Sequence, residues 1–380
     1  MESQHIISID GKEYEFGSGE TILDVARRNA IDIPTLCHMK GVSPTGACRM
    51  CMVEVSGARS LVASCAMAAA PKMTVRTQTE RVMNARRMNL EFLLASGHHN
   101  CLVQDLDMDK WTDFQLQALS TTEHMDICPA YGDCRLQEMA IQYGVRGNRF
   151  TPAQPRYPME TVNPLIVRDF SRCILCGRCV QACNEVQVNH AISFGYRGNG
   201  AKIVAKGDRP LKDSDCVFCG ECVQACPVGA LVTKADMDRK GHLAGEAKPV
   251  RTTCSYCGVG CQLYLHVKDD KVVRVTGVEG VGPNYGSLCV KGRFGYDFVS
   301  DPARLKTPLI RNNGGGFRKA SWDEALDLIA QKLSEIKEQS GPDSIGLLCS
   351  ARITNEENYL AQKFARAMIG TNNVDHCARL

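Results

Sequence analysis

Cysteine is the residue type through which this sequence could do most of its chemistry, because its 380 residues include 21 cysteines. Nineteen of these fall into five groups with short internal spacings, and closely spaced thiolates bind zinc or iron–sulfur clusters. Disulfide bonds are the alternative, but a disulfide framework is typical of short secreted chains. The N-terminal sequence has no basic stretch followed by an apolar one, so it predicts no signal peptide. The sequence therefore favours metal ligation.

The third and fourth groups are near copies of one another, "CILCGRCVQAC" at 173–183 and "CVFCGECVQAC" at 216–226. Both have the spacing C-x2-C-x2-C-x3-C, with Gly177 and Gly220 where a side chain would obstruct the approach to sulfur. In two-cluster ferredoxins, the fourth cysteine of each such run binds the cluster of the other run. One four-iron cluster is therefore expected on Cys173, Cys176, Cys179 and Cys226. The other is expected on Cys216, Cys219, Cys222 and Cys183.

The first group has the spacing C-x10-C-x2-C-x13-C and consists of Cys37, Cys48, Cys51 and Cys65. The segment before it predicts a hairpin that turns at Asp10-Gly11, then a helix with Ile22, Leu23, Val25, Ala26 and Ile31 on its apolar face. This resembles a ferredoxin-type β-grasp domain with a 2Fe–2S cluster. The x10 and x13 gaps resemble those of the large iron–sulfur subunit of respiratory complex I. Zinc is the alternative, although zinc sites usually show two short pairs of ligands.

The second group is less regular, with Cys101, Cys128 and Cys134 near three histidines. In the family related to the large iron–sulfur subunit of complex I, one histidine and three cysteines bind a four-iron cluster, with the spacing H-x3-C-x2-C-x5-C. Met125 stands where the middle pair of cysteines would begin, so Cys101 is interpreted as the displaced ligand, with about 26 residues inserted after it. The histidine ligand expected is His98, and the alternatives are His99 and His124.

The fifth group is followed by a lysine and consists of Cys254, Cys257, Cys261 and Cys289. "CSYCGVGCQLYLHV" and "GSLCVKGRFGYDFV" resemble the iron–sulfur segment of molybdopterin oxidoreductases, most closely that of formate dehydrogenases. The resemblance implies that Lys291 lies between a four-iron cluster and the pterin cofactor, where it would act as an electron bridge in catalysis and cofactor binding. The alternative is an ordinary solvated lysine.

The last segment predicts an α-β-α unit. A capping box of Ser321 and Glu324 opens a helix over 321–340, a buried strand follows at 344–350, and a helix capped by Thr354 and Glu357 runs to about Ile369. Only one strand is predicted here, which indicates an incomplete α/β domain. Cys349 is expected to be a buried small apolar residue without a ligand role.

The stretch that ends in "NNVDHCARL" resembles the segment of formate dehydrogenases that runs into the cysteine or selenocysteine ligand of molybdenum or tungsten. We therefore hypothesise a selenocysteine truncation, in which a UGA codon follows Leu380. The coding DNA beyond that codon tests this expectation. The chain alone would lack the metal ligand and is expected to be inactive with formate.

The composition is that of a globular protein, with 44% apolar and 23% charged residues. Apolar runs fall short of the roughly 20 residues that a membrane span requires, and a net charge of +3 without a basic block indicates no nucleic-acid partner. A cytoplasmic location is expected.

The sequence thus predicts an α+β multidomain protein. The segments expected are a β-grasp domain, a His/Cys-ligated segment, a two-cluster ferredoxin domain, a molybdopterin-type 4Fe–4S domain and an incomplete α/β cofactor domain, at 1–80, 81–160, 161–245, 246–305 and 306–380. The cofactors expected are one 2Fe–2S cluster and four 4Fe–4S clusters, with Mo- or W-bis(molybdopterin guanine dinucleotide) in a full-length protein.

The resemblance implies the iron–sulfur part of a formate dehydrogenase that interconverts formate and CO2. The partner expected is a flavin- and NAD-binding diaphorase-type subunit, or a hydrogenase or ferredoxin. A non-catalytic electron carrier and a complex-I-like subunit are the alternatives.

Overall fold

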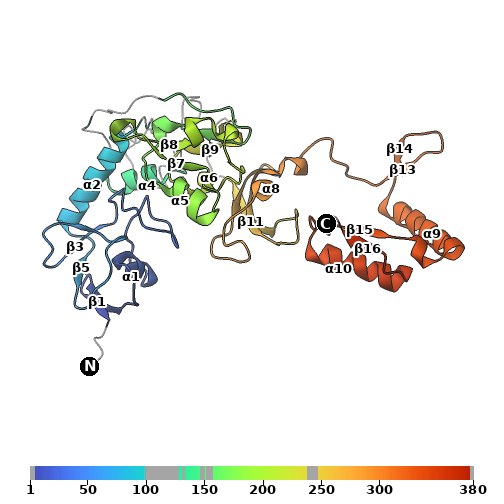
Figure 1. Ribbon diagram of the computed structural model, residues 1–380, viewed down its shortest axis with the longest axis horizontal. Coiled ribbons are helices and arrows are strands. Elements are labelled where there is room, and N and C mark those ends of the chain that lie inside the picture. The colour runs from blue at the N-terminus through green and yellow to red at the C-terminus, as the bar shows by residue number, and fades with distance from the viewer. Residues whose placement is uncertain are drawn as a thin grey trace. The chain divides into compact units, whose positions relative to one another are not determined.

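The computed structural model describes residues 5–97, 99, 128–130, 133–145, 150, 157–237 and 247–376. The chain divides into two compact units, residues 1–247 and 248–380 (Figure 1). Among the described residues, no helix combines the length and the apolar character needed to cross a bilayer.

The first unit begins with a five-stranded mixed sheet in the order β2-β1-β5-β3-β4. Its strands are β1 (Ile6–Ile9), β2 (Lys12–Glu15), β3 (Met52–Val55), β4 (Val62–Ala63) and β5 (Thr74–Arg76). The predicted hairpin is confirmed, because Ile9 pairs with Lys12 across a turn in which Asp10 and Gly11 both have positive φ. β1 and β5 run parallel, and the other pairs are antiparallel.

Helix α1 (Ile22–Arg28) packs its apolar face into the core of this sheet, together with Ile7, Ile9 and Val75. Thr21 opens it with a capping box, since its side chain accepts from the Asp24 amide and Asp24 accepts from the Thr21 amide. The helix ends earlier than the apolar pattern suggested. Ile31 was expected on its face, but it follows the last helical residue and is half-buried.

Helix α2 (Glu80–Ala95) anchors the loop of the first cysteine group through Arg86, whose side chain is fully buried. Its Nε and Nη2 donate to the carbonyl groups of Met50 and Met52 at 3.1 and 3.0 Å, on either side of Cys51. Its Nη1 donates to the Tyr143 hydroxyl at 3.3 Å, after helix α4 (Arg135–Gln142). One arginine therefore joins α2 to the cysteine loop and to the residues that follow Cys134.

Replacing this arginine by methionine is expected to destabilise the first unit by about 3 kcal/mol, because the buried carbonyl group of Met50 and the partly buried one of Met52 lose their donors. The change in the urea midpoint of Arg86→Met measures this. Arg81→Met is the matched control, since Arg81 lies on the same helix and makes one exposed hydrogen bond to the Arg59 carbonyl. Equal midpoints for the two variants would show that Arg86 does not hold the loop.

The cysteine runs at 173–183 and 216–226 lie between two pairs of short antiparallel strands. β6 (Ile166–Arg168) pairs with β9 (Leu231–Thr233), and β7 (Ile192–Gly195) pairs with β8 (Lys202–Ala205). Short helices α5 (Arg178–Gln181) and α6 (Glu221–Ala225) each start after a glycine, at the same place in the two runs, and α7 (Lys234–Met237) follows β9. The two similar cysteine runs therefore also share this feature of backbone structure.

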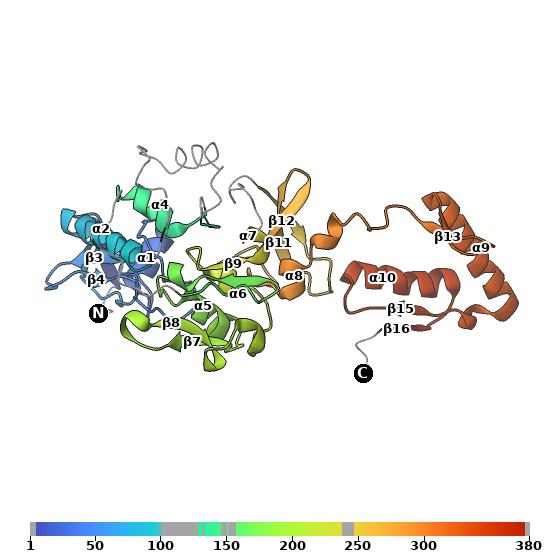
Figure 2. The ribbon, with the colours of Figure 1, turned by 90° about the horizontal axis from the view of Figure 1, so that it is seen from above.

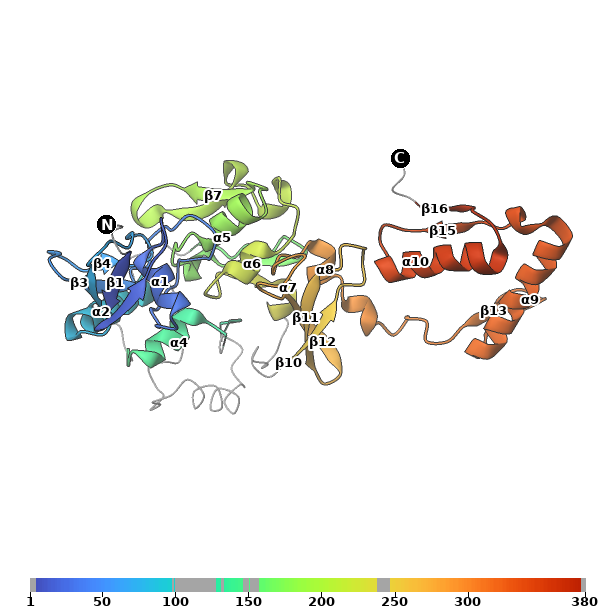
Figure 3. The ribbon, with the colours of Figure 1, turned by 90° about the horizontal axis from the view of Figure 1, so that it is seen from below.

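The second unit opens with the antiparallel sheet β10 (Lys248–Thr253), β11 (Gln262–Lys268) and β12 (Lys271–Gly277), and helix α8 (Val290–Phe294) contacts β12 (Figure 3). A hairpin of β13 (Leu309–Arg311) and β14 (Phe317–Lys319) precedes helix α9 (Trp322–Ser340). Strands β15 (Leu347–Cys349) and β16 (Val374–His376) are parallel, and helix α10 (Asn355–Phe364) lies along them (Figure 2).

The C-terminal elements confirm part of the expected α-β-α unit and correct part of it. Ser321 and Thr354 cap the N-termini of α9 and α10 as predicted, but only Thr354 has both hydrogen bonds of a capping box. Glu324 instead forms an ion pair with Arg318. The prediction of a single strand was wrong, because β16 pairs with β15.

Apolar side chains of this region remain exposed in the described residues. Leu348 on β15 is 92% exposed, and Trp322 and Leu326 on α9 are 69% and 55% exposed. Cys349 was expected to be buried but is only half-buried, because its two-stranded sheet is covered incompletely.

Candidate functional site

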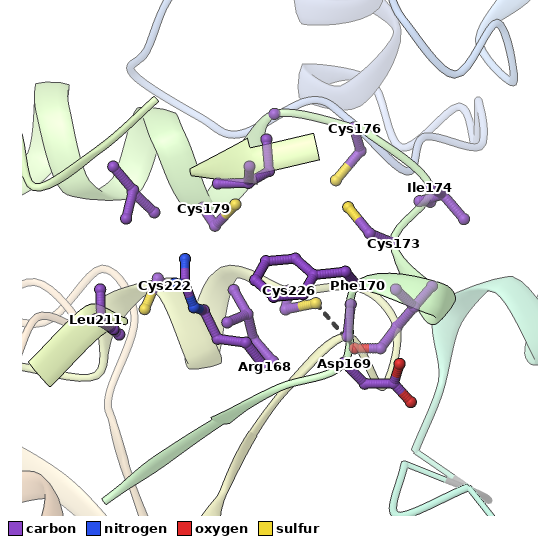
Figure 4. A pocket seen from close by; sticks show the side chains of 16 residues that line it. Arg168, Asp169, Phe170, Cys173, Ile174, Cys176, Cys179, Leu211, Cys222 and Cys226 are labelled. Carbon is purple, nitrogen blue, oxygen red and sulfur yellow. Dashed lines mark hydrogen bonds between the residues drawn. The ribbon is translucent and has the colours of Figure 1, made fainter. Parts of the chain in front are cut away.

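Three cysteines of the first run and two of the second run line one cavity of the first unit (Figure 4). They are Cys173, Cys176, Cys179, Cys222 and Cys226, and we call this space the Cys173 cavity. Its other walls are mostly apolar and include Ile174, Ile192, Ile203, Leu211, Val228, Ala230 and Leu231. The structure thus brings together the four cysteines that the sequence predicted as one ligand set, including Cys226 of the other run, and places with them Cys222 of the second predicted set.

The two runs fold into loops of the same shape. In each loop the third residue has a positive φ, 52° at Leu175 and 56° at Phe218, and the glycine that follows the second cysteine has φ of 80° or 75°. The amides of Leu175 and Phe218 each donate to the first sulfur of their own loop at 3.4 Å. Positive φ is costly for Leu and Phe, and such strain concentrates at binding sites. Sequence reasoning found the glycines but missed this pair.

The second set, Cys216, Cys219, Cys222 and Cys183, also draws on both runs. Burial raises the pKa of the Cys216 thiol, the nearby Cys219 and Cys183 raise it further, and the charge of Arg168 lowers it, so Cys219, Cys183 and Arg168 all lie near Cys216. The Ala191 amide donates to Cys183 Sγ at 3.3 Å. The fourth member of this predicted set, Cys222, instead lines the Cys173 cavity.

The thiols of the Cys173 cavity are difficult to ionise without a cation. Burial raises the pKa of Cys173 to about 11 and that of Cys176 to about 12, and it raises those of Cys179 and Cys226 as well. Thiolates are the form that binds iron. The donor set therefore fits a polynuclear cation, whose positive charge would offset the cost of burying four negative charges.

These pKa shifts predict that the metal-free protein loses stability at alkaline pH. The unfolded thiols ionise near pH 9.0, whereas the folded thiols of Cys173 and Cys176 ionise near 11 and 12. The contribution of these two protonated thiols to the free energy of unfolding is fully present below pH 9 and is lost as pH rises toward 12. Urea midpoints of apo-protein between pH 8 and 12 measure the loss. The double variant Cys173→Ala/Cys176→Ala should show a shallower decline, and a parallel decline would contradict the assignment to these thiols.

The first cysteine group forms two pairs of thiols, with Cys37, Cys48 and Cys51 before β3 and Cys65 after β4. Cys51 Sγ and Cys65 Sγ are 3.3 Å apart, and the Cys48 amide donates to Cys37 Sγ at 3.5 Å. The side-chain hydrogen bond between the two thiols lowers the pKa of Cys37 to about 5 in the first pair and that of Cys51 to about 6 in the second. The partner thiols shift upward for the same reason. Each pair therefore retains one proton until a cation displaces it.

Single-ion sites are not formed by the described residues, since no three His, Cys, Asp or Glu side chains converge on the space of one metal ion. Zinc requires about four donors around one ion. The two separate thiol pairs of the first group fit two iron atoms better than one zinc ion.

Only part of the second cysteine group falls within the described residues. Cys128 and Cys134 are both buried, and both lie against the segment after Cys226. A Cβ atom on Gly229 would lie 2.5 Å from Cys128 Sγ, and the Cys134 thiol donates to the Pro227 carbonyl at 3.8 Å. Cys101, His98 and His124 lie outside the described residues, and the alternative His99 lies within them.

The fifth group surrounds the start of α8 in the second unit. The Cys254 amide donates to the Cys261 carbonyl at 2.8 Å, and Cys289 is the N-cap residue of α8. Burial raises the pKa of Cys254 and of Cys261, and negative charge on Cys257 and Cys289 would raise both further, so the four predicted ligands lie close together. Lys291 lies on α8 two residues after Cys289, with an exposed side chain.

Arg168 was missed by sequence reasoning but lines the Cys173 cavity. The available signal was the charged pair Arg168-Asp169 inside the otherwise apolar run "PLIVRDF", in which Arg168 lies five residues before Cys173. A charge in such a run is either paired or aimed at a buried partner.

Comparison with known families assigns most of the chain. Residues 4–80 match the 2Fe-2S iron-sulfur cluster binding domain, and residues 172–230 match the 4Fe-4S dicluster domain. Residues 247–301 match the molybdopterin oxidoreductase Fe4S4 domain, and residues 304–380 match molybdopterin oxidoreductase.

The sequence matches to individual relatives cover nearly the whole chain. It is 34% identical to "Putative formate dehydrogenase YrhE" of Bacillus subtilis, over 98% of its length and 39% of that protein. It is 35% identical to the NADPH-Fe(3+) oxidoreductase subunit alpha of Geobacter sulfurreducens, over 98% of its length and 40% of that protein. The chain thus spans about two-fifths of the length of these relatives.

A solved structure is similar to a large part of the chain. It is the NAD+-reducing NiFe-hydrogenase in the H2-reduced state, with a TM-score of 0.51 and 31% identity. The similarity covers 61% of this chain and 88% of that chain.

Proposed function

Because this chain belongs to the molybdopterin oxidoreductase family and carries iron–sulfur domains ahead of its cofactor domain, we propose that it is the electron-transfer part of a formate dehydrogenase. The observation that carries this proposal is the Cys173 cavity, in which four thiols from both runs meet between apolar walls. Such a donor set fits a four-iron cluster.

The crossed pattern assigns the ligands of the two ferredoxin-type clusters. Cys173, Cys176, Cys179 and Cys226 hold one cluster, and Cys216, Cys219, Cys222 and Cys183 hold the other. The repeated loop shape supports the assignment, because amides that donate to sulfur stabilise the thiolate form of both loops.

The thiol pairs of the first group indicate which two cysteines hold each of its two iron atoms. Cys37 and Cys48 hold one iron atom of a 2Fe–2S cluster, and Cys51 and Cys65 hold the other. The contacts within each pair support this division. Arg86 fixes the carbonyl groups on either side of Cys51 and so keeps the second pair in place.

The remaining two clusters are assigned to the second and fifth cysteine groups. Cys128 and Cys134, with Cys101 and His98, are proposed to hold one of them, and the burial of the first two supports this. Cys254, Cys257, Cys261 and Cys289 are proposed to hold the other. Lys291 is proposed as the electron bridge from that cluster toward the pterin, and its exposed position on α8 beside Cys289 leaves it accessible to a cofactor.

Bound clusters of this kind exchange single electrons. The chain contributes the rest of the function: its apolar walls exclude water, its thiolates hold the iron, and its amide donors and charged side chains set the electrical potential at each site. In a full-length protein, a molybdenum or tungsten bis(molybdopterin guanine dinucleotide) would convert formate to CO2 or the reverse.

The partner proposed is a flavin- and NAD-binding diaphorase-type subunit, or a hydrogenase or ferredoxin. The similarity to a chain of an NAD+-reducing hydrogenase supports this class, because that protein couples a hydrogenase to the reduction of NAD+.

A second candidate function has a specific observation in its favour. The NADPH-Fe(3+) oxidoreductase subunit alpha is as similar to this chain as the formate dehydrogenase relative. In that case electrons would enter from NADPH rather than from formate.

Metal analysis and dye reduction test the proposal. The 380-residue chain, reconstituted with iron and sulfide without oxygen, is expected to hold about 18 iron atoms. A colourless protein, or one that binds zinc instead, would overturn it. Formate-dependent dye reduction is expected only from a full-length protein. Reduction of its clusters by NADPH through a partner subunit, without any response to formate, would favour the second candidate.

A further inference from the structure

Arg168 is a buried cation in the wall of the Cys173 cavity, where the proposed ligand assignment requires no positive side chain. It ends β6, which pairs with β9, and its backbone also exchanges two hydrogen bonds with Glu160, at 2.8 and 3.0 Å. Its side chain is 4% exposed. Its place in the wall is thus fixed by main-chain contacts on both sides.

The three nitrogen atoms of the guanidinium group differ in their hydrogen bonds within the described part of the chain. Nε and Nη2 donate to the two carboxylate oxygens of Glu160 at 3.2 and 2.6 Å. Nη1 is buried and has no hydrogen-bond partner among the described residues. A buried donor left without an acceptor costs about 1–3 kcal/mol, which indicates an acceptor at this place in the loaded protein.

The surroundings of Arg168 define that acceptor. It lines the same cavity as Cys173, Cys176, Cys179 and Cys226, and Figure 4 draws its side chain among these cysteines and Cys222. The guanidinium carbon of Arg168 lies 4.8 Å from the centre of the Phe170 ring, over the face of that ring. A cubane with four thiolates carries a charge of about 2−, and its sulfur atoms accept hydrogen bonds.

We propose that Arg168 is a potential-setting residue, whose Nη1 donates to the cluster held by Cys173, Cys176, Cys179 and Cys226 and makes that cluster easier to reduce. This inference rests on the proposed function. Reduction adds one electron to the cluster and forms or breaks no bond to Arg168. A nearby positive charge stabilises the reduced form more than the oxidised form, because the reduced form is more negative.

Glu160 supplies the opposite influence, which gives the proposal a sign that can be tested. Its carboxylate holds Arg168 in place, is 12% exposed and also accepts from the Leu211 amide at 2.9 Å. Neutralising it should leave the positive charge of Arg168 less compensated. The two partners of one ion pair are therefore expected to shift the potential in opposite directions, whereas a purely structural pair would affect only stability.

Redox titration of the anaerobically reconstituted full chain, followed by electron paramagnetic resonance, tests this. The relevant signal is the one that disappears in Cys176→Ala. At a fixed applied potential, Arg168→Met should lower the ratio of reduced to oxidised cluster roughly tenfold, which is about 59 mV for one electron. Glu160→Gln should raise the ratio, and Arg168→Lys should retain part of the wild-type ratio because it keeps the charge.

Arg197→Met is the matched control, because Arg197 lies in the same ferredoxin segment but is exposed, and it should leave the ratio unchanged. A shift of both Arg168→Met and Glu160→Gln in the same direction, or no shift in either, would overturn the inference. If Arg168→Met fails to bind iron, the sign of the Glu160→Gln shift decides alone: a rise supports the inference, and no change or a fall overturns it. Absence of all clusters from the wild-type chain would instead refute the proposed function.

Discussion

Cys226→Ala is expected to remove the same cluster as Cys176→Ala, although residue 226 belongs to the other cysteine run. Each single variant should bind about 14 iron atoms instead of about 18, and so should the double variant Cys176→Ala/Cys226→Ala. The double variant Cys219→Ala/Cys226→Ala should fall to about 10, because its two changes affect different clusters. The physical reason is that Cys226 lines the Cys173 cavity, whereas Cys219 lies near Cys216.

The measurement is total iron and acid-labile sulfide after anaerobic reconstitution, with the visible spectrum as a second readout. If each run held its own cluster, the expected iron contents would be reversed, with about 10 iron atoms in Cys176→Ala/Cys226→Ala and about 14 in Cys219→Ala/Cys226→Ala. The experiment therefore separates the two arrangements. Cys349→Ala is the control, since Cys349 is half-buried on β15 and has no predicted ligand role.

The cysteine spacing was sufficient to predict the two-cluster site because ligand loops are local structures. A C-x2-C-x2-C run places three thiols in one tight loop whatever the rest of the fold does, and the near copy supplies the crossed fourth ligand. The hairpin at Asp10-Gly11 was predictable for a similar reason, since turn chemistry depends on adjacent residues. Helix starts at Ser321 and Thr354 also depend on residues only three positions apart.

The features that sequence reasoning missed depend on contacts between distant residues. β16 contains only three residues, two of them polar, and forms because β15 offers it a parallel edge. The position of Arg168 depends on the pairing of β6 with β9, more than 60 residues later, and on Glu160. Neither contact leaves a periodic trace in the sequence, because a three-residue strand is too short to show one.

Gly277→Ala is expected to abolish the cluster of the second unit, because β12 and the loop before Cys289 are in backbone contact at this glycine. A Cβ atom on Gly277 would lie 1.9 Å from the Gly286 carbonyl oxygen, so the loop must move. Gly286 precedes the proposed ligand Cys289 by three residues. The displacement required is therefore transmitted to the fourth thiol.

The loop cannot move freely, since Asn284 ties it to β11. The Asn284 side chain accepts from the Gln262 amide at 2.7 Å and donates to the Gln262 carbonyl at 3.1 Å. Forcing a methyl group into such a packed site costs about 1–3 kcal/mol, on top of any loss of metal binding. The expected result is about 14 iron atoms per chain instead of about 18.

Gly314→Ala is the matched control in the same unit, because a Cβ atom at residue 314 meets no atom within 4 Å. It should leave the iron content unchanged. Full iron content in Gly277→Ala would show that the loop adjusts without moving Cys289. In that case the position of the fourth ligand would be set by α8, which begins immediately after Cys289, and not by the contact between Gly277 and Gly286.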